Sequence, residues 1–333
     1  MDIFLAPHMK ATAIAHANIA FVKYWGRSDD ELNLPLNDSI SMNLSNAFTK
    51  TTVEFDESLK QDEVRINGKQ PSEKARNRVT KFLDLVRDLA GTELRARVWS
   101  ENNFPTACGI ASSASAGAAL ALACCKALGL SLEERFVSRL ARRFSGSAAR
   151  SIPAGFVRWK AATSDELSFA YSIAPPGHWK LCDIVAVVSR EEKSISSAEG
   201  HRLAKTSPFL EARVRDASKR VEIVEKAILE KDLTTLGQEI ERDTISMHAV
   251  MMTSRPSLIY WRPETLKLML LVRKWRREGL ECYFTIDAGP NVHLICRPNF
   301  EREVVTLLKE EGIDGILTNY PGEGARLTDK HLF

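Results

Sequence analysis

Apolar residues in the first part of the chain follow the pattern of two long β-strands. The first strand is predicted over residues 11–25. The second is predicted over residues 39–55, and its end alternates clearly, with Thr51, Val53 and Phe55 on one face before the Asn67-Gly68 turn. Shorter strands are predicted over 94–99, and then over 155–159, 167–173 and 181–188 as a continuation of one sheet. Later strands are predicted over 281–286, 292–296 and 315–318.

Helical periodicity is strongest in the later part of the chain. An early helix is predicted between Ser72 and Gly91, and the sequence Ser131-Leu132-Glu133-Glu134 matches a capping box that would start a helix running to Phe144. Amphipathic helices are predicted over 208–229, 232–251, 263–277 and 301–310. Strands that come first and helices that come later, without regular alternation, indicate an α+β protein with two lobes. We expect domains at 1–185 and 186–333, a break near 183–197, and the active site between the lobes.

Composition excludes several classes of protein. The 333 residues are 44% hydrophobic and 27% charged, with a net charge of +3, so neither a disordered chain nor nucleic-acid binding through bulk charge is expected. No signal peptide and no membrane-spanning stretch are predicted. The six cysteines form no C-x-x-C pair, which favours a reduced, cytoplasmic protein. The seven histidines show no metal-ligand spacing, and His248 is expected to be a surface or satisfied core group.

Residues 105–117 form a loop of small side chains that leads directly into an apolar helix. Backbone amides at such a helix start attract anions, and Ser112 and Ser113 add hydroxyls that could reach phosphate oxygens or Mg²⁺. The segment matches neither a Walker A loop nor a dinucleotide fingerprint. A tightly packed helix start without any ligand is the alternative interpretation.

The loop resembles the phosphate loop of the GHMP small-molecule kinases when it is read with three other segments. These are Ala17-Asn18-Ile19-Ala20 with Lys23-Tyr24-Trp25-Gly26, the stretch 145–157 that begins Ser-Gly-Ser-Ala-Ala-Arg-Ser, and Asp287-Ala288-Gly289-Pro290-Asn291. Together they resemble the mevalonate diphosphate decarboxylase family over nearly the whole chain. The resemblance implies a two-lobed GHMP-kinase-like fold and a homodimer.

The family's reaction, as the resemblance implies it, uses ATP and Mg²⁺ to decarboxylate a 5-phosphorylated mevalonate. The 3-hydroxyl is phosphorylated, and that phosphate and CO₂ then leave to form an isopentenyl product. The partner would be a small-molecule substrate, with no nucleic acid and no membrane involved. A kinase that stops at 3-phosphorylation and a catalytically inactive binding module are the alternatives, and retention of the family's catalytic residues argues against both.

The resemblance assigns the catalytic roles to Asp287, Lys23 and Arg150. Asp287 would act on the hydroxyl, Lys23 would contact that aspartate and the transferring phosphate, and Arg150 would orient the substrate. Each residue also has a plain structural interpretation. Asp287 could hydrogen-bond its own turn, Lys23 could be a strand-end lysine reaching solvent, and Arg150 could be one more surface arginine.

Binding roles are carried over from the family in the same way. Asn18 would hydrogen-bond the substrate carboxylate, and the 5-phosphate end would be held by Tyr24, Arg27, Ser145 and Ser147. The nucleotide would be bound by Gly109, Ile110, Ala111, Ser112 and Ser113, with Ser113 also at the metal. Ser100 and Asn102 would lie near the base and ribose.

One segment departs from the family pattern and bears on the substrate. Where bacterial members usually read Ser-Ser-Arg-Glu-Gly-Met, this chain reads Ser196-Ser197-Ala198-Glu199-Gly200-His201. In the family this segment, including the position of Ser197, touches the outer phosphate of a diphosphate. Loss of an arginine–phosphate contact costs roughly 1.5–3 kcal/mol. Mevalonate 5-phosphate is therefore the expected substrate, with His201 in the vacated space. The alternative is a diphosphate substrate, with compensation by Lys193, Arg202 or Lys205.

Overall fold

The computed structural model describes residues 9–104, 112–191 and 195–333. Its first lobe is built on a mixed sheet in which the two long predicted strands, β1 (Lys10–Val22) and β4 (Ser39–Asp56), pair antiparallel along most of their length. The sheet has the order β13-β1-β4-β6-β5, and β7 and β8 extend it from β4. The remaining strands are β5 (Glu63–Ile66), β6 (Arg95–Asn102), β7 (Phe156–Trp159), β8 (Ala170–Ala174) and β13 (Arg326–Leu327), with a separate pair β2 (Arg27–Asp29) and β3 (Leu34–Pro35).

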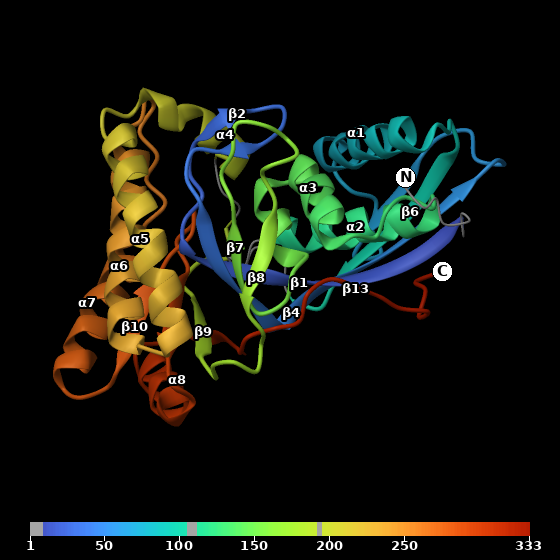
Figure 1. Cartoon of the computed structure of the whole chain (residues 1–333). Coiled ribbons are helices and arrows are strands. Elements are labelled where there is room, and N and C mark those ends of the chain that lie inside the picture. The colour runs from blue at the N-terminus through green and yellow to red at the C-terminus, as the bar shows by residue number, and fades with distance from the viewer. Residues whose placement is uncertain (1–8, 105–111, 192–194) are drawn as a thin grey trace.

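Three helices pack with this sheet (Figure 1). The helix α1 (Glu73–Ala90) begins after Ser72, whose side chain caps it, and ends at Gly91 in the left-handed conformation. The helix α2 (Ser112–Ala127) is apolar on nearly every side because it lies between β1 and β4 on one side and α3 (Glu134–Phe144) on the other. Its small side chains permit this close approach, so the start of α2 is placed against the strands that carry the N-terminal motif.

The second lobe has a four-stranded antiparallel sheet of order β10-β11-β9-β12. Figure 1 shows its long helices α5, α6 and α7 standing side by side at one end of the molecule. None of the helices among the described residues is long and apolar enough to cross a membrane. The bounds are β9 (Cys182–Val187), β10 (Cys282–Thr285), β11 (Val292–Cys296), β12 (Gly315–Asn319), α4 (Ser197–Leu203), α5 (Leu210–Glu230), α6 (Leu233–Thr253), α7 (Pro263–Arg277) and α8 (Glu301–Glu310).

One cluster of buried hydrophobic residues spans the two lobes. Ile19 and Phe21 of β1 pack with Val224 of α5, Ile240 of α6 and Ile295 of β11, all of them fully buried. Each lobe covers the inner face of the other, and this contact fixes the end of β1 against α5 and α6. This junction positions the residues that follow β1.

Two predictions about local structure are wrong, and one connection was not foreseen. The capping box at Ser131 does not form: α3 begins at Glu134, and the Ser131 hydroxyl instead accepts a hydrogen bond from the Glu133 amide at 3.3 Å. That short turn is satisfied locally, so it does not start the helix. The segment 181–188 was predicted to continue the first sheet, but β9 lies at the centre of the second. Near the end of the chain, β13 returns to pair with β1.

Gly237 of α6 shows how closely this helix packs against β10. A Cβ atom at this position would lie 2.0 Å from Cγ of Tyr283. Alanine is favoured over glycine inside a helix by about 1 kcal/mol, but the clash forces a buried ring to move, which typically costs about 1–3 kcal/mol. We therefore expect Gly237→Ala to lower the free energy of unfolding, measured by urea denaturation. Gly177→Ala, where the added Cβ would meet nothing within 4 Å, is the control and should be neutral. A stabilised Gly237→Ala variant would contradict this packing.

Candidate active site

Lys23 and Asp287 are brought together from the two lobes. Lys23 directly follows β1, and Asp287 follows β10 in the turn before β11. Lys23 Nζ lies 2.6 Å from Asp287 Oδ1, with the lysine side chain 2% exposed and the aspartate side chain 26% exposed. The lysine is therefore not a strand-end residue reaching into solvent. The carboxylate is partly open on the side that the lysine does not cover.

The turn at Asp287 is stabilised by its main chain. The Asp287 carbonyl accepts a hydrogen bond from the Gly289 amide at 2.7 Å and another from His248 Nε2–H at 3.1 Å. Among the described residues, the hydrogen bond recorded for the carboxylate itself comes from Lys23. The carboxylate is thus free of the turn, and the interpretation of Asp287 as a mere turn former is not what the structure shows.

The electrostatics of this pair follow from burial and charge. Burial raises the pKa of the Asp287 carboxyl, but the effects of the neighbouring Lys23, His293 and Arg150 outweigh burial, and the net pKa is lowered. Burial lowers the pKa of Lys23, against the opposing effects of Asp287 and Asp243. Asp287 is consequently ionised at neutral pH, next to a buried amine whose charge it supports.

Arg150 is a buried cation that lacks a carboxylate partner within the described part of the chain. It lies in the 3₁₀ helix η1 (Gly146–Ser151), is 4% exposed, and belongs to no ion pair there. Its guanidinium donates to Asn18 Oδ1 from Nε at 3.3 Å and from Nη2 at 3.1 Å, and to Ser39 Oγ at 3.0 Å. Asn18 is held in turn by Ser151 Oγ at 2.8 Å.

Burial lowers the pKa of Arg150 to about 10. A guanidinium buried with only neutral partners is costly, and an anion that enters the site relieves that cost. Arg150 is therefore not one more surface arginine. With Asn18 beside it, it can bind a carboxylate in bidentate fashion.

Tyr24, Arg27, Ser145 and Ser147 gather next to this arginine. Arg27 Nε donates to the Tyr24 hydroxyl at 2.6 Å, and burial raises the pKa of Tyr24 to about 12. The Tyr24 ring packs so closely on Gly146 that a Cβ there would lie 2.5 Å from the ring. Ser145 Oγ lies 3.3 Å from Ser147 Oγ and 3.4 Å from Ser113 Oγ. A row of hydroxyls thus connects the start of α2 with η1.

His201 lies on α4 between two aromatic rings. Its ring centroid is 4.1 Å from that of Tyr24 and 4.6 Å from that of Trp25, and its Nδ1 accepts a hydrogen bond from the Gly26 amide at 3.1 Å. Burial, together with the charges of Arg27 and Arg150, lowers the pKa of His201 well below its usual value. Ser197 and Ala198, at the start of α4, are exposed.

The residues expected to bind the nucleotide lie partly within the described ranges of the chain. Ser112 and Ser113 form the first turn of α2, whereas Gly109, Ile110 and Ala111 lie outside the described residues. Asn102 Oδ1 accepts from Thr49 Oγ1 at 2.7 Å, and that hydroxyl also contacts Ser115 of α2 at 2.6 Å, which places Asn102 beside the helix. The Ser100 hydroxyl instead pairs with Thr51 within the sheet. No cluster of three or more metal-ligating His, Cys, Asp or Glu side chains occurs in the part of the chain that the structure describes.

Sequence patterns did not identify the residues that support Asp287 from the second lobe, His248, His293 and Asp183. His248, a satisfied core group as expected, fixes the Asp287 carbonyl and stacks on Trp261 with ring centroids 4.6 Å apart. His293, which contributes to the lowered pKa of Asp287, has its Nδ1 2.9 Å from Asp183 Oδ1, and both residues are buried. Asp183 of β9 and His293 of β11 are diagonal neighbours, because Asp183 lies opposite Ile295 and His293 lies opposite Val185. Their contact depends on strand register, which the sequence does not show.

Because His248 is buried in its neutral form, the stability of the fold is expected to depend on pH. Burial lowers its pKa to about 3, against an ordinary value of 6.5. Below pH 6.5 the unfolded chain takes up a proton that the folded chain does not, so folding loses about 1.4 kcal/mol per pH unit for this group as the pH falls towards 3. We expect the free energy of unfolding of His248→Gln, measured by urea denaturation from pH 7 to pH 5, to fall less steeply than that of the natural chain. Equal slopes for His248→Gln and the natural chain would contradict the prediction.

Comparisons with known proteins agree with this architecture over almost the entire chain. Residues 15–170 match the family model described as "Diphosphomevalonate decarboxylase-like N-terminal domain", and residues 183–314 match "Mevalonate 5-diphosphate decarboxylase C-terminal domain". The diphosphomevalonate decarboxylase of Candida albicans is 35% identical, with 94% of this chain and 92% of the relative covered. The phosphomevalonate decarboxylase of Haloferax volcanii is 33% identical, with coverage of 95% and 96%.

Solved structures give the same result. A mevalonate diphosphate decarboxylase structure from Enterococcus faecalis is 39% identical and superposes with a TM-score of 0.90, covering 97% of this chain and 99% of that chain. A further structure, described as "MDDEF in complex with MVAPP, AMPPCP and Magnesium", is 40% identical, with a TM-score of 0.91 and the same coverage.

The fold and the site define a GHMP-kinase-like protein of two lobes, as expected from the sequence. Within that class, the chain belongs to the diphosphomevalonate decarboxylase family. The expected α+β fold, the expected family and the expected enzyme class, an ATP-dependent carboxy-lyase, are thereby confirmed.

Proposed function

We propose that this enzyme uses ATP to phosphorylate and decarboxylate a 5-phosphorylated mevalonate at the site formed by Lys23, Asp287 and Arg150. The observation that carries the proposal is the pairing of a partly exposed Asp287 carboxylate with buried Lys23, beside a buried Arg150 that lacks an acidic partner among the described residues. A carboxylic acid with a neighbouring hydroxyl fits such a site. A kinase that retains the substrate carboxylate is less well supported, because Arg150 and Asn18 provide a dedicated carboxylate clamp.

In this proposal Asp287 orients the 3-hydroxyl and accepts its proton. Its lowered pKa makes it a weak base, which suffices because phosphoryl transfer passes through a loose transition state that needs little deprotonation of the nucleophile. Lys23 keeps Asp287 ionised and is placed to contact negative charge arriving on the transferred group. Arg150 and Asn18 hold the carboxylate in line until the C–C bond breaks and its electrons displace the 3-phosphate, forming the alkene and CO₂.

ATP supplies the phosphoryl group, and Mg²⁺ neutralises charge on its phosphates. The residues present fit this pair: the start of α2 offers unpaired amides, Ser112 and Ser113 add hydroxyls, and the Ser113 hydroxyl lies 3.4 Å from that of Ser145. A related structure carries magnesium and AMPPCP, an ATP analogue. We therefore propose that Ser113 lies at the metal, as the sequence predicts.

The 5-diphosphate is the substrate that the comparisons favour. The match to both family models and names such as that of the Candida albicans relative support it, whereas the relative from Haloferax volcanii is named for the monophosphate expected from the sequence. The structure also offers compensation: Lys205 Nζ lies 3.3 Å from Asp30 Oδ2, and Arg27 lies 3.8 Å from the same carboxylate. Both cations thus lie next to Asp30, and Lys205 is close enough to Arg27 to bind the outer phosphate of a diphosphate.

The monophosphate stays a second candidate because of α4. His201 is packed between Tyr24 and Trp25 and is held by Gly26, so it occupies space next to the residues proposed for the 5-phosphate. Ala198 brings no charge to the same helix. CO₂ release with ATP and each of the two substrates, compared as kcat/KM, separates the candidates. Release from neither substrate, with ATP still consumed, would indicate a 3-kinase. The homodimer, the cytoplasmic location and the domain boundary near residue 185 stay predictions.

A further inference from the structure

Lys23 lies just beyond the end of β1, where the sheet no longer provides partners for its main chain. Its amide and its carbonyl both need hydrogen bonds because the residue is 1% exposed. Side chains supply them. The amide donates to Asp243 Oδ2 at 2.8 Å, and the carbonyl accepts from Arg213 Nη2 at 3.3 Å and from Asn37 Nδ2 at 3.2 Å.

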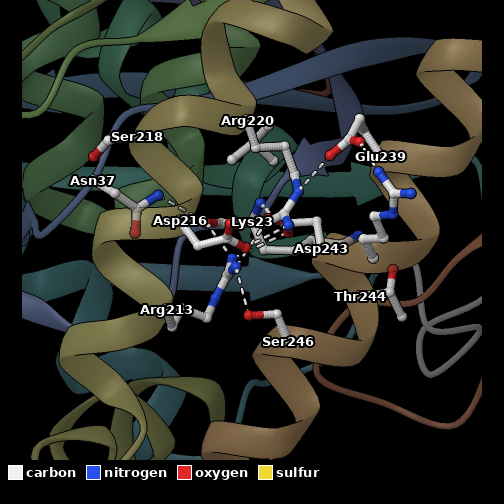
Figure 2. Close-up of polar contacts among 12 residues, drawn as sticks. Lys23, Asn37, Arg213, Asp216, Ser218, Arg220, Glu239, Asp243, Thr244 and Ser246 are labelled. Carbon is white, nitrogen blue, oxygen red and sulfur yellow. Dashed lines mark hydrogen bonds and ion pairs between the residues drawn. The ribbon is translucent and has the colours of Figure 1, made fainter.

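Asp243 of α6 is the centre of this arrangement (Figure 2). It is fully buried, and it accepts two hydrogen bonds from Arg213 of α5, at 2.9 and 3.1 Å, and one from Arg220 at 3.2 Å. Arg220 also donates to Glu239, one turn before Asp243 on α6, at 3.0 Å. The network therefore has a side that touches Lys23, formed by Asp243 and Arg213, and a side that does not, formed by Arg220 and Glu239.

The network consists of buried ion pairs between α5 and α6. A buried ion pair is often no more stabilising than well-packed apolar residues of the same volume, so its presence at one location calls for another reason. Here Asp243 and Arg213 of the second lobe hydrogen-bond to the main chain of Lys23 in the first lobe, and the Lys23 ammonium contacts Asp287. A displacement of Lys23 by a fraction of an ångström would change the 2.6 Å contact on which the site depends.

We propose that Asp243, fixed by Arg213, is a positioning residue for Lys23: it holds the lysine main chain so that the ammonium meets Asp287. This inference rests on the proposed function for its activity readout, and it assigns Asp243 no contact with the substrate.

The charge of Asp243 adds a second effect. The charged and titratable groups that face Lys23 are Asp287 from the turn after β10, Arg150 from η1, and Asp243 and His248 from α6, with Arg213 from α5 at its carbonyl. Burial lowers the pKa of Lys23, and Asp287 and Asp243 raise it. Removal of the Asp243 charge therefore makes Lys23 lose its proton at a lower pH.

The test compares Asp243→Asn with Glu239→Gln. Both variants neutralise a buried acid of α6 that pairs with Arg220 of α5, but only Asp243 is hydrogen-bonded to Lys23. We expect Asp243→Asn to lower kcat by about tenfold to a hundredfold with little change in the KM for ATP, and to move the alkaline limb of the kcat profile to lower pH. Glu239→Gln should lose a similar amount of stability and keep both the natural kcat and the natural alkaline limb. Equal kcat and equal pH profiles for the two variants would overturn the proposal.

A direct measurement separates this inference from the proposed function. The ¹³Cε signal of Lys23, assigned by its loss in Lys23→Arg, can be titrated in the free protein without substrate. We expect its titration to move to lower pH in Asp243→Asn and to stay in place in Glu239→Gln, whatever reaction the enzyme catalyses. If Asp243→Asn does not fold, Arg213→Lys keeps the positive charge but loses the fork that joins Asp243 to the Lys23 carbonyl. A folded Arg213→Lys with natural kcat and a natural Lys23 titration would overturn the proposal equally.

Discussion

Replacement of Asp287 by asparagine is expected to lower kcat for ATP-dependent CO₂ release by more than about a hundredfold, the usual effect of removing a positioned base. Asparagine has the same shape, and the turn should persist because it is held through the Asp287 carbonyl by Gly289 and His248. What disappears is the charge that pairs with Lys23 and the oxygen that accepts the proton. The affinity for ATP should change by less than about twofold, since the nucleotide is assigned to the start of α2.

The control for this experiment is Asp314→Asn, an exposed aspartate in the turn before β12. It should retain natural activity and natural stability. If Asp287→Asn retained most of its activity, Asp287 would be a structural residue, and the proposed mechanism would fail with it. A loss of ATP binding in parallel with kcat would instead place Asp287 at the nucleotide.

The double variant Ala198→Arg with His201→Met is expected to shift the ratio of kcat/KM towards mevalonate 5-diphosphate by up to about tenfold to a hundredfold over the natural chain. Ala198 is exposed, so an arginine fits there without repacking, and it lies three residues before the buried His201 on α4, within reach of a long side chain. The new guanidinium offers a charge-assisted hydrogen bond to an outer phosphate that the monophosphate lacks.

A matched variant, Ala198→Met with His201→Met, changes size without adding charge and should leave the ratio nearly unchanged. His201→Met also removes the acceptor of the Gly26 amide, which costs about 1–3 kcal/mol of stability, so thermal unfolding must be measured alongside. No shift in the ratio, with both variants folded, would show that α4 does not reach the outer phosphate. A strong preference of the natural chain for the diphosphate would assign that contact to Lys205 and Arg202.

Much of the fold could be predicted because its elements obey local rules. The helices α7 and α8 and the strand β11 coincide with their predicted bounds, since periodicity, a leading Pro263 and the glycine turns mark them in the sequence. The short strands β2, β3 and β13 have no such pattern. They exist because tertiary neighbours complete their hydrogen bonds, so no local signal predicts them.

The candidate site divides in the same way. Lys23, Asp287 and Arg150 stand in compact motifs, and the structure brings Lys23 and Asp287 into contact, with Arg150 close enough for its charge to lower the pKa of Asp287. Asp243, Arg213 and His248 lie in helices whose sequence is that of ordinary amphipathic helices. Their polar side chains point inward, where only the packing of α5 and α6 on β1 gives them partners. A buried charge on an otherwise apolar helix face is the one signal that could have found them.

The pairing of β13 with β1 affects the order in which the molecule can be assembled during synthesis. Ala13 faces Leu327 and Ile14 faces Arg326, so at these two positions the outer edge of β1 has no strand partner until residues 326 and 327 have been made. The first sheet is therefore incomplete after β8 has been made, and a nascent chain that ends before residue 326 exposes unpaired backbone groups at this part of β1. Unpaired backbone groups of this kind can template association with other chains, so β13 both completes this part of the sheet and reduces the risk of aggregation.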